Sequence, residues 1–234
     1  MNKRFKLAAG LTAGLLAASP ACFAQYTATL TGVGTGTVAD GVYVSPYVGT
    51  IQGPGVDYTG FMVCDDFTTE SHLNMPWSAT TTNAGALNGS EKFASNVVFG
   101  GQSYSAQYAY DAAAWLANHL VQTLTPLNKT AQIDYSFAIW DLFDGQPTDP
   151  NGLGNVATYE QEALSAALGG YTGSNVSVYT PSLTNPKGLR ESQEFLVVNP
   201  VPAPEMDASS AGGAVTLLLG SLLILRGRRV DRSR

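Results

Sequence analysis

Few residues in this chain of 234 have side chains suited to chemistry. Cys64 is the single cysteine between residues 25 and 199, so it is either a buried small hydrophobe or a reactive thiol. Its flanks, Phe61-Met62-Val63, favour burial in a strand. The two histidines, His72 and His119, lie far apart, and no Cys-x-x-Cys motif occurs. We therefore predict no transition-metal site and no cofactor, and we expect His119 to be a hydrogen-bonded structural residue.

Carboxylates offer a second kind of chemistry. Asp141, Asp144 and Asp149 cluster after an expected helix, where oxygen ligands in a loop could hold calcium, or could support a surface hydrolase if they met in a cleft. Their spacing does not match the known twelve-residue calcium loop, which favours a solvated acidic loop instead. Asp65 and Asp66 are adjacent at the end of an expected strand, so we expect them to point to opposite faces. They are not expected to work as one acid–base pair.

The N-terminal segment has the pattern of a secretory signal peptide. Three basic residues precede an uncharged apolar run at 7–18, which Ser19-Pro20 interrupts. Small residues at positions 22 and 24 suit signal peptidase, so cleavage is predicted after Ala24. Residues 1–24 are thus interpreted as a Sec export signal.

The segment at 25–199 is long enough for one domain with its own core. It holds four basic and fifteen acidic residues, which leaves a formal charge of −11. Eight of the twelve basic residues of the chain lie in the two ends. Such an acidic body repels phosphates, so neither nucleic acid nor an anionic lipid surface is expected as a partner.

The C-terminal segment has the physical pattern of a membrane anchor. An uncharged apolar run covers about residues 209–225, and a rise of about 1.5 Å per residue gives roughly 25 Å, just enough for a bilayer core. Arg226, Arg228 and Arg229 begin a basic tail at 226–234. Because basic flanks stay in the cytoplasm, the body is expected on the far side of the membrane.

A motif precedes that apolar run and strengthens this interpretation. Pro202, Pro204, Glu205 and Met206 lie within Val201-Pro-Ala-Pro-Glu-Met-Asp207. Together with the apolar run and the arginines, residues 200–234 resemble the PEP-CTERM sorting signal of Gram-negative bacteria, with Met206 in place of its second motif proline. The resemblance implies processing by exosortase, an inner-membrane location before processing, a surface or extracellular location afterwards, and exopolysaccharide or matrix as a neighbour.

Hydrophobic spacing changes along the body. Alternation and turn residues predict strands in its first and last parts, and a spacing of three to four residues predicts three helices in the middle. The fold class is therefore α+β: an antiparallel β layer covered by about three helices, followed by the C-terminal transmembrane sorting helix. Strands are expected at 26–30, 42–44, 47–51, 58–67, 78–82, 176–179 and 194–199, and helices at 108–124, 130–143 and 158–168.

Three short segments of the body, at 63–67, 112–116 and 137–143, resemble a pattern of uncharacterised PEP-CTERM proteins and are similar to bacterial surface thioester domains. Those domains join a strand cysteine to a helix glutamine just before an Ala-Ile-Trp-like run. Here that position is Ser136, which cannot supply an acyl group, and Gln132 lies one turn earlier on the same face. The resemblance implies a shared scaffold. It leaves two interpretations, a Cys64–Gln132 thioester or a cysteine buried beside core aromatic residues.

These patterns predict an exported, non-enzymatic envelope protein with a structural or interaction role. The first alternative is an adhesin that captures its target covalently through Cys64 and Gln132. The second is a surface hydrolase that uses the carboxylates between Asp141 and Asp149.

Overall fold

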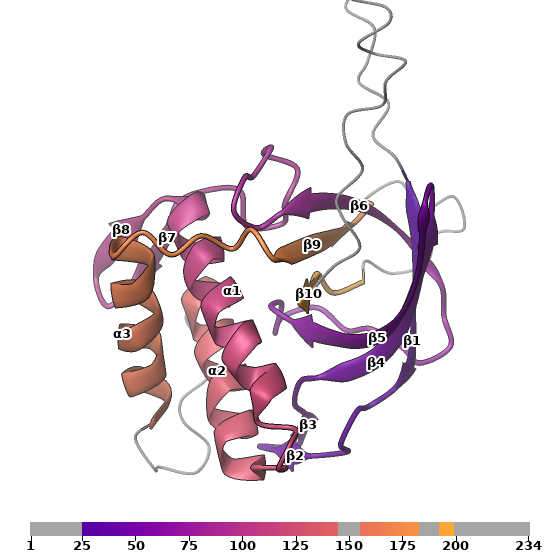
Figure 1. Ribbon diagram of the computed structural model, residues 1–234, viewed down its shortest axis with the longest axis horizontal. Helices are drawn as coiled ribbons and strands as arrows, with labels where there is room; N and C mark the ends of the chain where they lie inside the picture. The colour runs from indigo at the N-terminus through magenta and orange to yellow at the C-terminus, as the bar shows by residue number, and fades with distance from the viewer. Residues whose placement is uncertain (1–24, 145–154, 183–191, 199–234) are drawn as a thin grey trace, which may run out of the picture.

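A computed structural model describes residues 25–144, 155–182 and 192–198 (Figure 1). Strands form one side of the domain and three helices form the other. Within these ranges no helix combines the length and apolarity needed to cross a bilayer. The predicted cleavage site at Ala24, the sorting motif, the apolar run at 209–225, the arginine tail and Asp149 lie outside the described residues.

The strands form a closed six-stranded barrel in which every neighbouring pair is antiparallel. Closure removes the open edges that an isolated sheet would expose. The sequence predicted the strands and their antiparallel pairing, and the structure adds that β6 pairs with both β1 and β9. Around the barrel the order is β1 (Tyr26–Gly32), β4 (Tyr47–Gly53), β5 (Val56–Cys64), β10 (Phe195–Val198), β9 (Val176–Pro181) and β6 (Trp77–Asn83).

Alternating side chains of β1 help to fill the barrel, whereas β9 and β10 are buried along almost their whole length. Tyr26, Ala28 and Leu30 of β1 are buried, whereas the threonines between them are more exposed. The Tyr26 ring meets Tyr179 of β9 edge to face, with ring centroids 5.9 Å apart. Gly53 leaves room for that ring, because a Cβ atom there would lie 2.3 Å from Tyr26 Cδ1. Any side chain at Gly53 would therefore displace the ring from the barrel interior.

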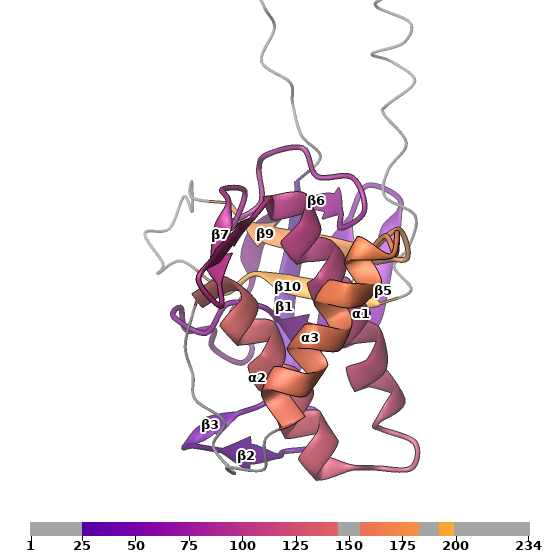
Figure 2. The same ribbon diagram turned by 90° about the vertical axis from the view of Figure 1, so that its left-hand side faces the viewer.

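The three predicted helices are confirmed as α1 (Ala106–Gln122), α2 (Lys129–Asp144) and α3 (Asn155–Leu168). Ser105 caps α1, because its hydroxyl accepts the backbone N–H of Tyr108. Buried alanines at positions 109, 113 and 117, each about one turn from the next, give α1 a small-residue face. The helices pack on one another: α1 and α2 form the layer next to the strands, where α1 contacts β10 and α2 contacts β5, and α3 packs on the far side of both (Figures 1 and 2). This layer covers the strand ends where the candidate site lies.

Two small hairpins complete the described part of the fold. One joins β2 (Val38–Ala39) to β3 (Val42–Tyr43), and Asp40 and Gly41 in its turn both have positive φ angles, as a two-residue hairpin of this kind requires. The other joins β7 (Val97–Phe99) to β8 (Gln102–Tyr104). The sequence did not predict β2, β7 or β8, because strands of two or three residues carry no readable alternation.

Candidate functional site

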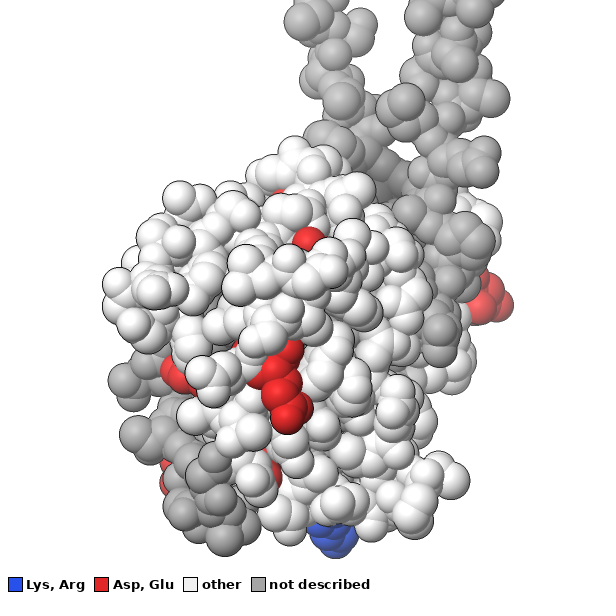
Figure 3. All heavy atoms as spheres, turned by 60° about the vertical axis from the view of Figure 1, so that its left-hand side comes forward, with Lys and Arg blue, Asp and Glu red and all other residues white. Residues whose placement is uncertain are grey.

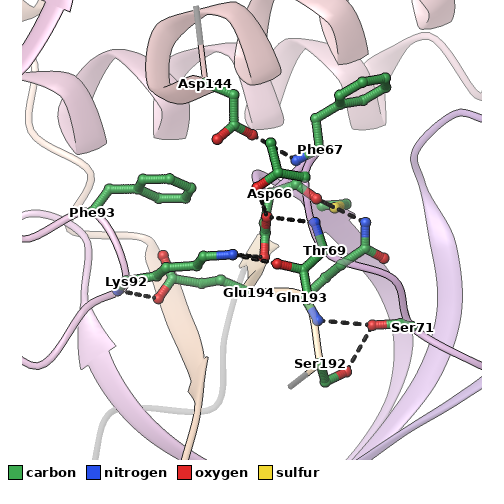
Figure 4. Close-up of polar contacts among 12 residues, drawn as sticks. Asp66, Phe67, Thr69, Ser71, Lys92, Phe93, Asp144, Ser192, Gln193 and Glu194 are labelled. Carbon is green, nitrogen blue, oxygen red and sulfur yellow. Dashed lines mark hydrogen bonds and ion pairs between the residues drawn. The ribbon is translucent and has the colours of Figure 1, made fainter. Parts of the chain in front are cut away.

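The titratable groups of the domain gather where β5 ends beside β10, under the helix layer. Cys64 closes β5 opposite Phe195, and Asp65 and Asp66 follow it. Glu194 directly precedes β10, and all three acids and the thiol are fully buried. We call the group formed by Asp65, Asp66, Lys92, Asp144 and Glu194 the acidic junction; Figure 4 shows most of its contacts.

Asp66 contacts one opposite charge and accepts hydrogen bonds from the loop that follows it. Lys92 Nζ lies 2.5 Å from Asp66 Oδ2, the one ion pair among the described residues. The backbone N–H of Thr69 and the hydroxyl of Thr68 donate to Asp66 Oδ1 at 3.2 and 3.3 Å. A buried carboxylate needs such partners, because the cost of removing a charge from water is several kcal/mol. The Asp66–Lys92 pair therefore anchors the loop after β5 to the segment before α1.

Glu194 joins three separate elements of the domain. Its Oε1 accepts the hydroxyl of Tyr110 on α1, and its Oε2 accepts the hydroxyl of Thr180 on β9. The backbone N–H of Lys92 also donates to Oε2, at 2.8 Å. Removing this carboxyl would leave three buried donors without a partner, each at a cost of about 1–3 kcal/mol. Glu194 is therefore a structural centre of the barrel–helix contact.

Asp65 faces Glu194 whereas Asp66 pairs with Lys92, so the two adjacent aspartates have different partners. Burial raises the pKa of Asp65 well above its usual value, and the nearby charge of Glu194 raises it further. Burial also raises the pKa of Glu194, although its hydrogen bonds from Thr180 and Tyr110 oppose the effect. The pair therefore holds a proton at a pH where both carboxyls would be ionised in the unfolded chain.

Cys64 is a buried strand residue, as its flanks predicted. Its thiol donates to the backbone carbonyl of Asp66 at 3.2 Å, and its N–H donates to Ser45 Oγ at 2.9 Å. Burial raises the pKa of the Cys64 thiol well above its usual value, and the charge of Asp65 adds to that effect. A thiol in this setting stays protonated near neutral pH and is a poor nucleophile.

Gln132 on α2 is also fully buried, and its carboxamide is saturated with hydrogen bonds. Its Nε2 donates to the Ser45 carbonyl at 2.7 Å, while its Oε1 accepts the hydroxyls of Thr35 and Thr37 at 3.0 Å each. Ser45 thus contacts both candidate thioester residues, through its hydroxyl on the Cys64 side and its carbonyl on the Gln132 side. Among the described residues, no hydrogen bond joins the Cys64 thiol to the Gln132 carboxamide.

Ser136 stands where the resembled domains have glutamine, and its environment is likewise structural. Its hydroxyl donates to the Gln132 carbonyl one turn earlier, at 2.8 Å. It also reaches the Ser45 carbonyl at 3.4 Å. Ser136 therefore connects α2 to the segment before β4, and it has no acyl group that a thioester could use.

The two described aspartates of the predicted calcium cluster have different partners. Asp144 Oδ2 accepts the backbone N–H of Phe67 at 2.7 Å, whereas the Asp141 carboxyl hydrogen-bonds that of Glu160 on α3. Burial raises the pKa of Glu160 to about 8, and the contact with Asp141 contributes. Within the described ranges no three acidic, histidine or cysteine side chains are placed to hold a metal ion.

Glu160 lines a hollow of about 380 Å³ between α3 and the β7–β8 hairpin.

A second hollow, of about 370 Å³, lies where α1 ends and α2 begins. His119, Tyr135 and Tyr159 line it, one from each helix. The expected structural role of His119 agrees with its contacts, because its Nδ1 lies 2.8 Å from the Trp115 carbonyl and its ring stacks on the Trp115 ring. The rings are half-buried, so the hollow combines aromatic faces with access to solvent.

Sequence reasoning missed several residues that organise the site. Ser45, Lys92 and Glu194 carry its main contacts, yet none belongs to a motif. Thr35, in a glycine-rich stretch at 32–36, also belongs to no motif, yet its hydroxyl bonds to Gln132. An acid placed directly before the apolar run Phe195-Leu196-Val197 was the one available signal for Glu194.

Comparison with known proteins gives likeness in structure alone. No protein-family model matches the chain, and neither does any curated protein sequence. Solved structures similar to it include the N-terminal thioester domain of a Clostridium perfringens surface protein, at 11% identity and a TM-score of 0.41 over 74% of this chain and 97% of that one. The N-terminal thioester domain of the Streptococcus pyogenes fibronectin-binding protein SfbI gives 13% identity and a TM-score of 0.43, over 79% and 97%. The N-terminal domain of the S. pyogenes pilus tip adhesin Cpa gives 12% and 0.40, over 76% and 95%. Likeness at this level assigns no role to any residue of this chain.

Proposed function

We propose that this chain is exported by the Sec pathway, sorted by an exosortase through residues 200–234, and acts in the cell envelope as a non-enzymatic binding or structural protein. The acidic body and the two apolar ends with their basic flanks motivate the location. The role is motivated by the placement of the reactive residue types inside the fold.

The observation that carries the proposed role is the complete burial of Cys64, Gln132 and Glu194. Hydrogen bonds join each of them to the scaffold, so a substrate could reach them only if the barrel–helix contact opened. Opening that contact would break the bonds of Glu194 to α1 and β9. A role that uses the outer surface of an intact domain is therefore favoured.

Cell fractionation with intact-mass analysis tests the proposed location and processing. We expect the protein in the envelope or outside the cell, with a mass that lacks residues 1–24. A reporter fused after Asn199 should be active only outside the cytoplasm. A full-length chain recovered from the cytosol would overturn the proposal.

A covalent-capture adhesin is the second candidate, and the shared contact of Cys64 and Gln132 with Ser45 is the observation in its favour. In that chemistry the Cys64 sulfur would attack Gln132 Cδ, form a thioester and release the side-chain nitrogen as ammonia. The protein would then be lighter by one ammonia molecule and would show no free thiol after unfolding. An intact mass without that loss, with one thiol titrated in denaturant, would dismiss the candidate.

A further inference from the structure

Four aromatic side chains form a continuous line that crosses all three helices. Trp115 and His119 lie on α1, Tyr135 lies on α2 and Tyr159 lies on α3. Their ring centroids are 3.7 Å apart between Trp115 and His119, 6.0 Å between His119 and Tyr135, and 4.1 Å between Tyr135 and Tyr159. We call these four residues the aromatic row. Each is only half-buried, so the row ties the three helices together and still reaches solvent.

Polar groups surround the open part of this row. The hollow of about 370 Å³ beside it is lined by His119, Tyr135 and Tyr159 together with Gln122, Thr123 and Asn128. Gln122 and Asn128 are exposed. The rings of the row stack on one another, so they offer apolar contact through their edges and through the second face of Tyr159, while amides and hydroxyls offer donors and acceptors around them. A ligand that suits both must be apolar on one face and rich in hydroxyl groups around it, as a sugar ring is.

Charge decides between neutral and charged ligands of this shape. The lining of the hollow contains no Lys, Arg, Asp or Glu. Glu162 is exposed on α3, one turn after Tyr159, and its charge acts on both tyrosines of the row. The helix-bearing side of the molecule is mostly uncharged, with scattered acidic groups and a basic group at its lower edge (Figure 3). An anionic polymer would be repelled by this surface, whereas a neutral one would not.

We propose that the aromatic row and its polar rim bind a neutral polysaccharide. A sugar ring packs on the face of Tyr159 that Tyr135 does not cover and against the ring edges of Tyr135 and His119, and its hydroxyls are bonded by Gln122 and Asn128. This inference rests on the proposed function, because it names the ligand class of a binding protein in the envelope. The site is shallow and crosses three helices, which suits a stretch of extended chain.

Affinity electrophoresis of the mature protein, purified from its native envelope, tests the inference. The gels contain soluble neutral polysaccharides as probes (dextran, mannan and hydroxyethyl cellulose), with alginate as the anionic comparator. We expect retardation by at least one neutral probe and none by alginate. Tyr159→Ala should weaken that binding about tenfold or more, as the loss of a stacked anchor does at other interfaces.

Tyr104→Ala is the matched control. Tyr104 also stacks on a tyrosine, Tyr108, at 5.2 Å, but it belongs to the hairpin side of the layer and should leave binding unchanged. If Tyr159→Ala does not fold by circular dichroism, Gln122→Ala, an exposed rim change, takes its place and should weaken binding several-fold.

Absence of retardation by every neutral probe would overturn the inference, as would equal binding of wild type and the row variant, or comparable binding of alginate. Binding is measured on purified protein and location on fractionated cells, so the two proposals can fail separately. A surface protein without polysaccharide binding would refute the site alone, and a cytosolic chain would refute the proposed function.

Discussion

Substitution of Asp65 by asparagine should change how the stability of this protein depends on pH. Asp65 is fully buried and faces Glu194, and both effects raise its pKa. The folded protein therefore keeps a proton that the unfolded chain loses above about pH 4. Because the folded pKa is raised, the stability from this group is complete below that pH and is lost as the pH rises towards the folded pKa.

The magnitude follows from proton linkage. One extra bound proton in the folded state lowers the free energy of unfolding by about 1.4 kcal/mol for each pH unit between the unfolded and the folded pKa of Asp65. Asparagine has the shape of protonated aspartate and does not titrate, so Asp65→Asn should reduce the slope by about this amount. At neutral pH it should be as stable as wild type or more stable.

Urea denaturation followed by tryptophan fluorescence at several pH values measures this slope. Asp57→Asn, an exposed change on the same strand, is the control and should keep the wild-type slope. If Asp65→Asn keeps the wild-type slope as well, the carboxyl is ionised in the folded protein and the proposed proton sharing with Glu194 is wrong.

Four further predictions concern the core and the site. Glu160→Gln should weaken the pH dependence of the free energy of unfolding between about pH 5 and pH 8, because the raised pKa of about 8 makes wild type lose stability as the pH rises through that range. The same pH dependence for both proteins in urea denaturation would contradict this. Phe137→Ala, at a fully buried position, should cost about 3–5 kcal/mol in urea denaturation, and a cost below about 1 kcal/mol would contradict its core role. Iodoacetamide should label Cys64 only after the protein is unfolded, and mass spectrometry detects the label. Fast labelling of the native protein would show that the thiol is exposed or activated. Gln132→Ala should lower the free energy of unfolding by about 2–4 kcal/mol, because the buried Ser45 carbonyl and two threonine hydroxyls lose their partner. If urea denaturation shows no change beyond error, other groups have replaced these bonds.

The local parts of the fold were accessible from the sequence because they follow local rules. Apolar spacing located α1 and α2 within two residues at each end, and proline and glycine located their ends. Barrel closure depends on β6 meeting β1 and β9, pairs that are far apart in the sequence. Nothing in the alternation of Trp77–Asn83 says which strands it will join, so closure could not be predicted.

The candidate site divides in the same way. The burial of Cys64 followed from its apolar neighbours, which are adjacent in the chain. Gln132, by contrast, contacts Thr35 and Ser45, which lie 97 and 87 residues away in the sequence. The aromatic row was also hidden, since its members come from three helices whose relative rotation the sequence does not state.

The most direct test of the account is the intact mass and thiol count of the protein recovered from its native envelope. The account predicts an envelope-associated chain that lacks residues 1–24 and has one free thiol, which becomes titratable only in denaturant. A cytosolic chain that retains residues 1–24 would contradict it.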